Sequence, residues 1–355
     1  TPQAFVVRSL SDESFPQWDA FVEKHPLGLI YHTTAWKRCL EQAFPHMRAR
    51  FLALVDPRSD DIVAGLPVYE VRSRLLGNRL VSVPFASICD PLVSSASQMQ
   101  ALLAPLLDLK TNMGARRIEV RALKNSRVLA DAGWTGSAGH VHHVLYLDKL
   151  PDTVLPSFEK KSIRYEIKKA SKSGFRVIVG QTAADLAVFF RIICLDRKRL
   201  GLPQIPNRFF SAMWDGLDPR QRTLYLAVRD GQAAAALLTT QFSGFCSVEY
   251  AGDTRIAGGS GINKLLYWQA IQAAKQLGYT AFGFGRTAIG NEGLRQFKKR
   301  WGTIEEPIFS FTYGPGKPGN NADPSITYHL ARFAIRHLPR SLYRILGNFI
   351  YRHWG

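Results

Sequence analysis

The sequence predicts a mixed α/β (α+β) chain built of two similar domains and a helical tail. Its 355 residues suffice for two domains of ordinary size. Apolar residues make up 46% and charged residues 21% of the chain, values typical of a globular protein and unlike those of a disordered or collagen-like one. Strand and helix patterns alternate along the first half, and the alternation starts again after Pro151. We therefore expect one domain over 1–150 and a second over 151–313.

The first half is expected to begin its sheet with a hairpin. Residues 50–56 and 61–71 are rich in aliphatic and β-branched side chains and flank a turn at 57–60. After this hairpin, apolar residues recur at helical spacing in 98–113, and short apolar runs lie before and after that segment. These patterns predict a helix over 98–113 and strands over 80–84, 117–121 and 141–147.

The second half repeats this character. Its pattern reads helix, strand, helix, then three strands, then helix and strand. The turn Asp230-Gly231 takes the place that Asp60-Asp61 holds in the first half. The expected helices cover 153–173, 182–200 and 262–277, and the expected strands cover 175–179, 223–229, 233–241, 244–251 and 280–284.

A basic amphipathic tail follows a Gly/Pro/Asn-rich linker at 314–324, so the region 314–355 forms a third part. Pro339 is expected to divide the tail into two short helices. Arginines spaced among apolar residues favour docking on anionic lipid or RNA. A tail packed on the first domain with a solvated basic face is the alternative. Five arginines and no acidic residue lie within 326–354: Arg332, Arg336, Arg340, Arg344 and Arg352.

Charge and cysteine usage narrow the functional class. The chain carries 46 Lys+Arg against 28 Asp+Glu, and this net charge of +18 predicts attraction to nucleic acid, anionic lipid or phosphorylated substrates. No leader pattern and no run of 18 apolar residues occurs, so we expect a cytoplasmic protein, peripheral at most at the inner face of the membrane. The four cysteines lie far apart and predict neither a zinc site nor a disulfide framework: Cys39, Cys89, Cys194 and Cys246.

The densest cationic segment is 159–176. Arg164, Lys168 and Lys172 are expected along one flank of a helix whose apolar residues face the core. Such a row of charges suits a pyrophosphate or an RNA backbone. A solvated helix face is the alternative.

A second candidate segment, 279–302, is an apolar strand that runs into a Gly-rich turn and a short helix. Gly285 allows a substrate to approach the backbone, and Arg286 can bind a phosphate or carboxylate bidentately. Lys298 could stabilise a developing oxyanion. Phe297 and Trp301 share a helix face and could equally be core residues.

Two further positions carry titratable groups. Glu249 lies near the end of the apolar strand 245–251 and is a candidate general base for an attacking amine. A solvated or paired carboxylate is the alternative reading there. His140 and His142 share one strand face, but without a carboxylate or thiolate partner they do not predict a metal site.

Seven short blocks, taken together, carry a family resemblance. In the second half they are Arg199-Leu-Gly-Leu-Pro203, Asn263-Lys-Leu-Leu-Tyr-Trp268, Phe282-Gly-Phe-Gly-Arg-Thr287 and Phe297-Lys-Lys-Arg-Trp-Gly302. In the first half they are Tyr31-His-Thr-Thr-Ala-Trp36, Gly65-Leu-Pro67 and Leu76-Gly-Asn-Arg-Leu-Val-Ser-Val-Pro-Phe85. The set resembles the FemAB-like group of GNAT-related transferases, in its exosortase- and exopolysaccharide-linked branch. The likeness covers roughly residues 28–313.

This resemblance implies two tandem GNAT-like (acyl-CoA N-acyltransferase-like) domains. It also implies transfer of an aminoacyl group from aminoacyl-tRNA to an amine of a peptidoglycan-type, cell-envelope or exopolysaccharide precursor, without metal, cofactor or covalent enzyme intermediate. Lys37 beside Trp36 matches the family's lysine near the phosphates of the precursor. Phe297 and Lys298 match the Phe-Lys pair near the reacting ester.

The sequence departs from the family in two places. It lacks the long helical-hairpin arm of some members, and Ile88-Cys89 stands where relatives often carry Tyr-Gly-Gly. An acyl-CoA donor is the first alternative, because Arg255-Ile-Ala-Gly-Gly-Ser260 approaches the pyrophosphate-binding motif Q/R-x-x-G-x-G/A before a helix, although it ends in Ser. A non-catalytic membrane- or RNA-binding module is the second.

Overall fold

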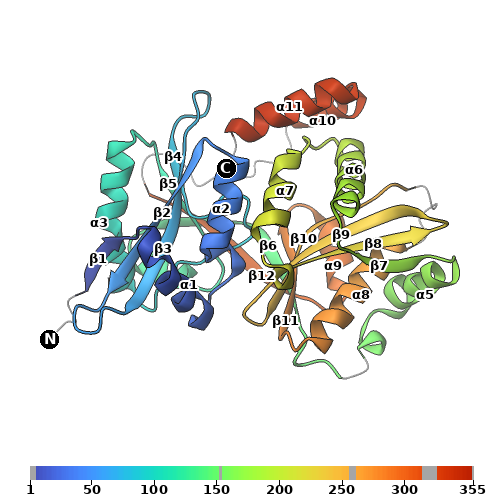
Figure 1. Ribbon diagram of the computed structural model, residues 1–355, viewed down its shortest axis with the longest axis horizontal. Helices are drawn as coiled ribbons and strands as arrows, with labels where there is room; N and C mark the ends of the chain where they lie inside the picture. Colours follow the sequence, from blue (N-terminus) through green and yellow to red (C-terminus); the bar gives the residue numbers. More distant parts are fainter. Residues whose placement is uncertain (1–4, 152–153, 256–260, 314–325, 354–355) are drawn as a thin grey trace. The chain divides into compact units, whose positions relative to one another are not determined.

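The computed structural model describes residues 5–151, 154–255, 261–313 and 326–353. Its backbone contacts divide the chain into two compact units (Figure 1). Unit 1 comprises residues 1–141, 307–321 and 351–355, and unit 2 comprises 142–306 and 322–350. The sequence-based boundary at 150 stays a prediction, since the contacts change over between Val141 and His142, inside a strand.

Unit 1 is a mixed sheet covered by helices. Its strands follow the order β1-β2-β3-β4-β5-β12, and neighbouring strands run antiparallel except β4 and β5, which run parallel. Apolar residues of α3 and of the strands form one core cluster, which includes Leu52, Leu66, Met99 and Val120. The elements are β1 (Val6–Ser9), α1 (Phe15–Lys24), α2 (Thr34–Ala43), β2 (Met47–Val55), β3 (Ile62–Val71), β4 (Arg79–Val81), α3 (Ala96–Asn112), β5 (Ile118–Ala122), α4 (Ser126–Asp131) and β6 (Thr135–Tyr146), with 3-10 turns at Asp12–Ser14 and Ile30–His32.

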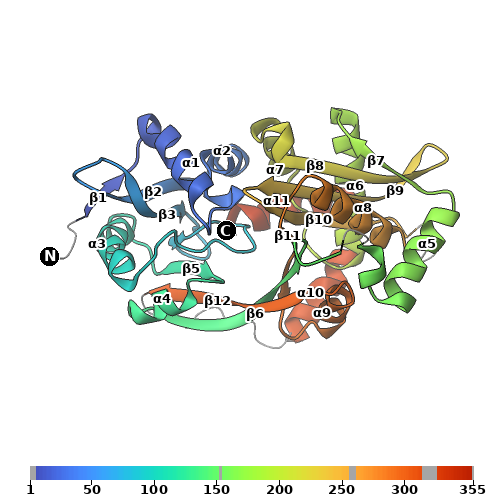
Figure 2. The ribbon, with the colours of Figure 1, turned by 90° about the horizontal axis from the view of Figure 1, so that it is seen from below.

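Unit 2 has the strand order β6-β11-β10-β9-β8-β7, with β10–β11 parallel and β7 to β10 antiparallel. Its core cluster includes Leu237, Leu266 and Trp301, and α8 lies beside α5 (Figure 2). The elements are a π-helical turn (Lys160–Arg164), α5 (Tyr165–Lys172), β7 (Arg176–Gly180), α6 (Ala183–Arg199), α7 (Asn207–Gly216), β8 (Arg222–Arg229), β9 (Gln232–Phe242), β10 (Phe245–Asp253), α8 (Ile262–Gln276), β11 (Ala281–Ala288), α9 (Glu292–Lys299) and β12 (Ile304–Tyr313), with 3-10 turns at Leu155–Ser157 and Pro219–Gln221.

Both halves of the chain repeat one order of elements. Each reads strand, two helices, three antiparallel strands, a helix, a parallel strand, a helix and a last strand. The last strand of the second half, β12, pairs with β5 within unit 1, from Phe309↔Ala122 to Tyr313↔Ile118. The last strand of the first half, β6, continues into unit 2. The repeat confirms the prediction of a mixed α/β fold with two similar halves.

Most predicted elements are confirmed within a few residues, but the helix expected over 153–173 is wrong in extent. Continuous α-helix covers only Tyr165–Lys172, because Phe158 and Glu159 adopt extended backbone with ψ of 157° and 128°. Phe158 is 3% exposed, and its ring packs edge-on against Trp301 at 5.0 Å between centroids. This core contact overrides the helical pattern. The sequence pattern also missed α1, α2, α7, β1 and β12.

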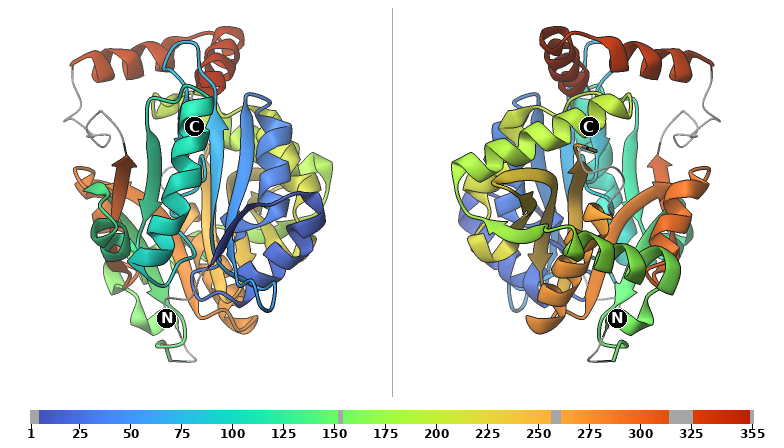
Figure 3. Two further views of the ribbon diagram at one scale, coloured as in Figure 1. Left: turned by 90° about the vertical axis from the view of Figure 1, so that its left-hand side faces the viewer. Right: turned by 90° about the vertical axis from the view of Figure 1, so that its right-hand side faces the viewer.

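The tail forms α10 (Ile326–His337) and α11 (Arg340–His353), so the predicted division at Pro339 is confirmed. The linker 314–324 lies outside the described residues. Within unit 2, α10 lies beside α6 (Figure 3). At its far end α11 enters unit 1, where His353 Nδ1 is 3.1 Å from Ser73 Oγ and the His353 carbonyl accepts from Arg79 Nη2 at 3.1 Å. That the tail packs on the first domain stays a prediction.

Candidate active site

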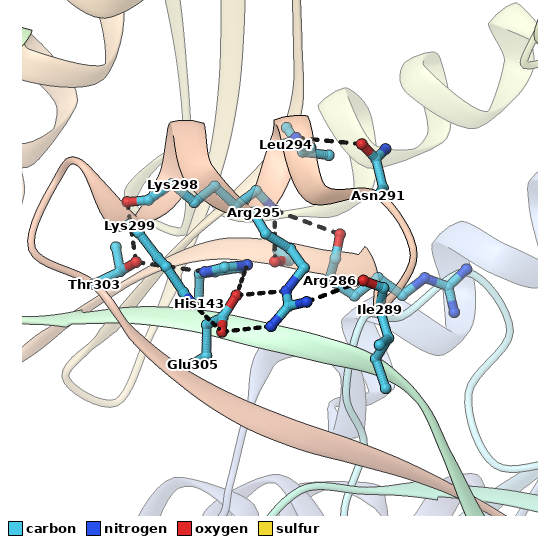
Figure 4. A network of polar contacts seen from close by, with 11 residues as sticks. His143, Arg286, Ile289, Asn291, Leu294, Arg295, Lys298, Lys299, Thr303 and Glu305 are labelled. Carbon is cyan, nitrogen blue, oxygen red and sulfur yellow. Dashed lines mark hydrogen bonds and ion pairs between the residues drawn. The ribbon is translucent and has the colours of Figure 1, made fainter. Parts of the chain in front are cut away.

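Lys298 is a lysine enclosed in unit 2. Only 4% of it is exposed, and its Nζ donates to the Gly285 carbonyl at 2.8 Å and to the Arg286 carbonyl at 3.4 Å (Figure 4). Burial lowers the pKa of Lys298 to about 7, because a low-dielectric surrounding disfavours the ammonium form. Lysines are seldom buried unless a carboxylate pairs with them, and here both acceptors are neutral carbonyls. A strongly perturbed lysine of this kind marks a candidate catalytic group.

Local backbone and packing place this amine. Gly285 has a φ of +71°, a conformation that costs a side-chain-bearing residue strain. The Asn291 side chain caps α9 by accepting from the Leu294 N–H at 3.2 Å. At the other end of α9, Trp301 is fully buried. Phe297 is half-buried and packs edge-on against Tyr267 at 5.9 Å between centroids.

A polar network centred on Glu305 contacts the side chains of α9 and lies below this helix in Figure 4. Glu305 accepts two hydrogen bonds from Arg295, at 2.9 and 3.0 Å, and forms an ion pair with Lys299 at 2.8 Å. The Arg295 hydrogen bonds lower the pKa of Glu305 to about 2. His143 Nε2 lies 3.5 Å from the Glu305 carboxylate, and burial followed by the charge of Lys298 lowers the pKa of His143 to about 4. At pH 7, therefore, Glu305 is ionised and His143 is neutral.

Strands β10 and β11 separate beside this amine. They pair in parallel from Phe245↔Ala281 to Ser247↔Gly283, and among the described residues no pair continues beyond that point, although both strands run on. Glu249 lies two residues past the last pair on β10, and Gly285 lies two residues past it on β11. Glu249 is the extra residue of a β-bulge, and such bulges commonly re-aim a side chain beside an active site. Its Oε1 accepts from Thr240 Oγ1 at 2.6 Å.

The predicted cationic residues of unit 2 lie on two segments. Arg164 closes the π-helical turn and is half-buried, whereas Lys168 is exposed on α5. The same helix meets the start of α8, because a Cβ on Gly261 would stand 2.6 Å from the Glu166 carbonyl oxygen. Arg286 is exposed, and its side chain points away from the Glu305 network (Figure 4). The motif expected at 255–260 lies outside the described residues after its first position.

Comparisons with known proteins fit this geometry. Residues 157–299 match the family model described as acetyltransferase (GNAT) domain. A curated relative, the UDP-N-acetylmuramoylpentapeptide-lysine N(6)-alanyltransferase of Weissella viridescens, is 27% identical over 130 residues, which span 36% of this chain and 38% of the relative. The crystal structure of FemX superimposes with a TM-score of 0.71 at 16% identity, covering 86% of this chain and 96% of FemX. Residues 157–299 thus match a GNAT acetyltransferase domain, and the chain shares the fold of FemX.

A further structural neighbour agrees with the duplicated architecture. The tandem GNAT protein from the clavulanic acid biosynthesis pathway superimposes with a TM-score of 0.55 at 15% identity, covering 88% of this chain and 100% of that one. The expectation of tandem GNAT-like halves is thereby confirmed.

In unit 1, the candidates Trp36 and Lys37 lie at the start of α2. Thr33 caps this helix by accepting from the Trp36 N–H at 3.2 Å. Trp36 is 1% exposed and packs edge-on against Tyr31, so its side chain positions α2 rather than facing solvent. Lys37 Nζ is 2.8 Å from a Glu41 carboxylate oxygen and 5.2 Å from the centre of the Phe15 ring.

Unit 1 also brings a cysteine and a histidine together, but not as a nucleophile and its base. His32 Nδ1 accepts from the Leu29 N–H at 3.1 Å, and burial lowers the pKa of His32 to about 4. The neutral ring therefore carries its proton on Nε2, which faces the Asp90 carbonyl at 2.8 Å and Cys89 Sγ at 3.2 Å. A protonated nitrogen cannot accept the thiol proton, so the pair at the Ile88-Cys89 departure is structural.

Sequence reasoning missed the groups that surround Lys298. No sequence motif marks His143 or Glu305. Both come from strands that approach α9 only in the folded chain. Among the described residues, no group of three or more His, Cys, Asp or Glu could hold a metal ion. None of the helices in the described ranges has the length and hydropathy needed to cross a bilayer.

Proposed function

We propose that this FemAB-like protein transfers an aminoacyl group from aminoacyl-tRNA to an amine of a cell-envelope, peptidoglycan-type or exopolysaccharide precursor, with Lys298 at the reacting carbonyl. The observation that carries the proposal is the buried Lys298 amine, held on two backbone carbonyls beside the separation of β10 and β11. The curated relative is an alanyltransferase by its name, which favours an aminoacyl donor. The tRNA donor and the acceptor class follow from the family resemblance.

Aminoacyl transfer from an ester to an amine needs one cation to stabilise the oxyanion and one base to accept a proton. The precursor amine attacks the ester carbonyl, a C–N bond forms, and the ester C–O bond breaks to release the ribose hydroxyl of the tRNA. An ammonium has three N–H groups, and two of those of Lys298 donate to Gly285 and Arg286. The third serves the oxyanion of the tetrahedral intermediate, where a charge in a desolvated site acts most strongly. Glu249 accepts the proton that the attacking amine loses.

The remaining candidates have binding roles in this proposal. Arg164, Lys168 and Arg286 attract the phosphates of the donor. Lys37, positioned by Trp36, attracts the phosphates of the precursor. Phe297 packs beside the reacting ester, and Gly285 keeps that stretch of backbone free of a side chain.

Single-turnover transfer from alanyl-tRNA to UDP-N-acetylmuramoyl-pentapeptide, followed by mass spectrometry of the precursor, tests the proposal. We expect Lys298→Met to lower the rate about 10²- to 10³-fold, as removal of an oxyanion donor does. Glu249→Gln should lower it about 10²-fold. Lys24→Met, a change of an exposed lysine on α1, is the matched control and should leave the rate unchanged. Unchanged turnover in Lys298→Met would remove its oxyanion role.

An acyl-CoA donor is the second candidate, because the matching family model is that of an acetyltransferase domain. Calorimetric titration with CoA thioesters and with charged tRNA separates the two donors. Micromolar affinity for the thioester, together with acyl transfer from it, would replace the aminoacyl donor. Failure of every donor to give turnover would favour a non-catalytic binding module.

A further inference from the structure

One face of the helical tail is fixed to unit 2. Arg332 donates from Nε and Nη2 to the Leu200 carbonyl, at 3.0 and 2.7 Å. The Tyr343 hydroxyl donates to the Leu202 carbonyl at 2.9 Å, and Tyr343 is only 3% exposed. The backbone at Gly347 lies so close to Gln204 that a Cβ would stand 2.4 Å from the Gln204 carbonyl oxygen. These contacts hold α10 and α11 along the segment that follows α6.

The opposite face of the same helices is apolar and exposed. On α10 the exposed apolar residues are spaced i, i+3, and on α11 they are spaced i, i+3, i+7, so each set forms one stripe. With about 100° per residue, the α11 stripe lies on the side away from Tyr343 and Gly347. The exposed residues are Leu330 (62%), Phe333 (62%), Leu342 (49%), Ile345 (60%) and Phe349 (53%).

Positive charge borders this stripe at Arg336, three residues after Phe333, and at Arg352, three residues after Phe349. No acidic residue occurs between 326 and 353, and four arginines there are exposed: Arg336, Arg340, Arg344 and Arg352. A tail that only packed against the protein would bury its apolar residues and expose its basic ones. Here large apolar residues stay exposed beside the arginines even though the helices are already anchored on their other face.

We propose that α10 and α11 dock on an anionic phospholipid surface, with the apolar stripe among the acyl chains and the arginines at the lipid phosphates. Apolar insertion and attraction to anionic headgroups act together on such helices. Long arginine side chains reach from the helix to the headgroup level while their neighbours insert. The proposal is independent of the transfer reaction, since the binding surface contains none of the residues assigned to it.

Two other occupants fit the surface less well. RNA is recognised through phosphates and through stacking of its bases on aromatic or guanidinium planes, which gives no role to Leu330, Leu342 and Ile345. A second copy of the chain would bring its own exposed arginines against these, and the facing like charges would oppose association. A bilayer accommodates both the aliphatic stripe and the charges.

Sedimentation of the full chain with vesicles tests the proposal, using phosphatidylcholine alone and a 7:3 mixture with phosphatidylglycerol at 0.1 M NaCl. We expect at least tenfold stronger binding to the anionic vesicles. Changing Arg336 and Arg352 to Gln should lower that affinity about 30-fold, at about 1 kcal/mol for each arginine near the surface. The triple change Leu342→Ser, Ile345→Ser, Phe349→Ser should lower it about 100-fold or more.

A control removes comparable apolar surface elsewhere on unit 2. Ile178, Val179 and Leu277 are 42%, 53% and 73% exposed, and the triple change Ile178→Thr, Val179→Thr, Leu277→Ser should leave vesicle binding unchanged. Phe349→Trp in an otherwise unchanged chain reports insertion into the bilayer. Compared with the parent protein, this variant should show additional tryptophan emission that is blue-shifted on vesicle binding and quenched by brominated lipid. Because these positions are exposed, thermal unfolding of every variant should match that of the parent protein.

Several outcomes would overturn the proposal. They are equal binding to neutral and anionic vesicles, no binding at all, or added emission in the Phe349→Trp variant that brominated lipid leaves unquenched. Loss of tRNA binding in the apolar triple variant with vesicle binding intact would assign the surface to RNA. A dimer in solution that the same variant dissociates would assign it to a second copy. Each readout is binding, so failure here is distinguishable from failure of the transfer reaction.

Discussion

Replacing Lys298 by methionine should stabilise the protein while removing its activity. Lys298 is 4% exposed, and its pKa is lowered from 10.5 to about 7. A depression of this size corresponds to about 5 kcal/mol of disfavoured charge in the folded state, at 1.36 kcal/mol for each pKa unit. Methionine has a similar shape without the charge. It leaves the Gly285 and Arg286 carbonyls without this donor, at a cost of about 1–3 kcal/mol. We therefore expect a net gain of about 2–4 kcal/mol at pH 6.

The sign of the pH dependence follows from linkage. Below pH 7 both folded and unfolded chains carry the proton on Lys298, and the full penalty for burying the charge is present. Between about 7 and 10.5 the unfolded chain binds more protons than the folded one, so stability of the parent protein rises with pH in this window. The advantage of Lys298→Met should accordingly shrink by about 2–3 kcal/mol between pH 7 and pH 9.

Urea unfolding of both proteins, measured by circular dichroism from pH 6 to pH 9.5, checks this prediction. The transition of interest is the one that the substitution shifts, because the chain has two compact units. Other titrating groups cancel in the difference between the two proteins, and the pKa of the neighbouring His143, at about 4, lies well below the window. A difference that stays constant across the range, or a less stable variant at pH 6, would refute the burial of a charged lysine at this position.

Two further predictions concern the same network. At subsaturating substrate, kcat/KM should fall as pH rises through about 7, where Lys298 of the free protein loses the proton that the oxyanion role requires. A kcat/KM that instead rises through that pH would make the neutral amine the active form. Glu305→Gln should lower the free energy of unfolding by about 1–2 kcal/mol at pH 7, a value reduced because Arg295 and Lys299 are partly solvated. Because the pKa of Glu305 is lowered to about 2, this contribution is present above about 4.5 and is lost as pH falls toward 2, so urea unfolding at pH 3 should show a smaller difference than at pH 7.

Elements with a periodic local sequence pattern could be predicted from the sequence. Alternating and helical apolar patterns located most strands and helices, and Pro339 located the break in the tail. Short blocks pointed to Phe297 and Lys298. None of these patterns predicted that Lys298 is buried. The carbonyls that accept its hydrogen bonds belong to β11, which a turn separates from α9.

Features that arise from long-range contacts were out of reach. Strand β12 pairs with β5 in unit 1, and no local sequence pattern in 304–313 predicts this pairing. Glu305 and His143 lie far apart in the sequence, and only the folded sheet brings them together. Trp36 was a binding candidate because it lies in a family block, but its side chain is buried in the folded protein. The packing of Phe158 against Trp301 likewise ended a helix that the local pattern favoured.

The distribution of charges around α9 fits the proposed role of Lys298. A carboxylate lies close by, on Glu305, but its oxygens accept from Arg295 and pair with Lys299 instead. An ion pair with Glu305 would raise the pKa of Lys298 and cancel most of its field. Neutral carbonyls orient the amine without neutralising it, and burial then leaves a cation with no carboxylate partner among the described residues. That uncompensated charge costs stability, and an oxyanion formed during acyl transfer is the species that would relieve the cost.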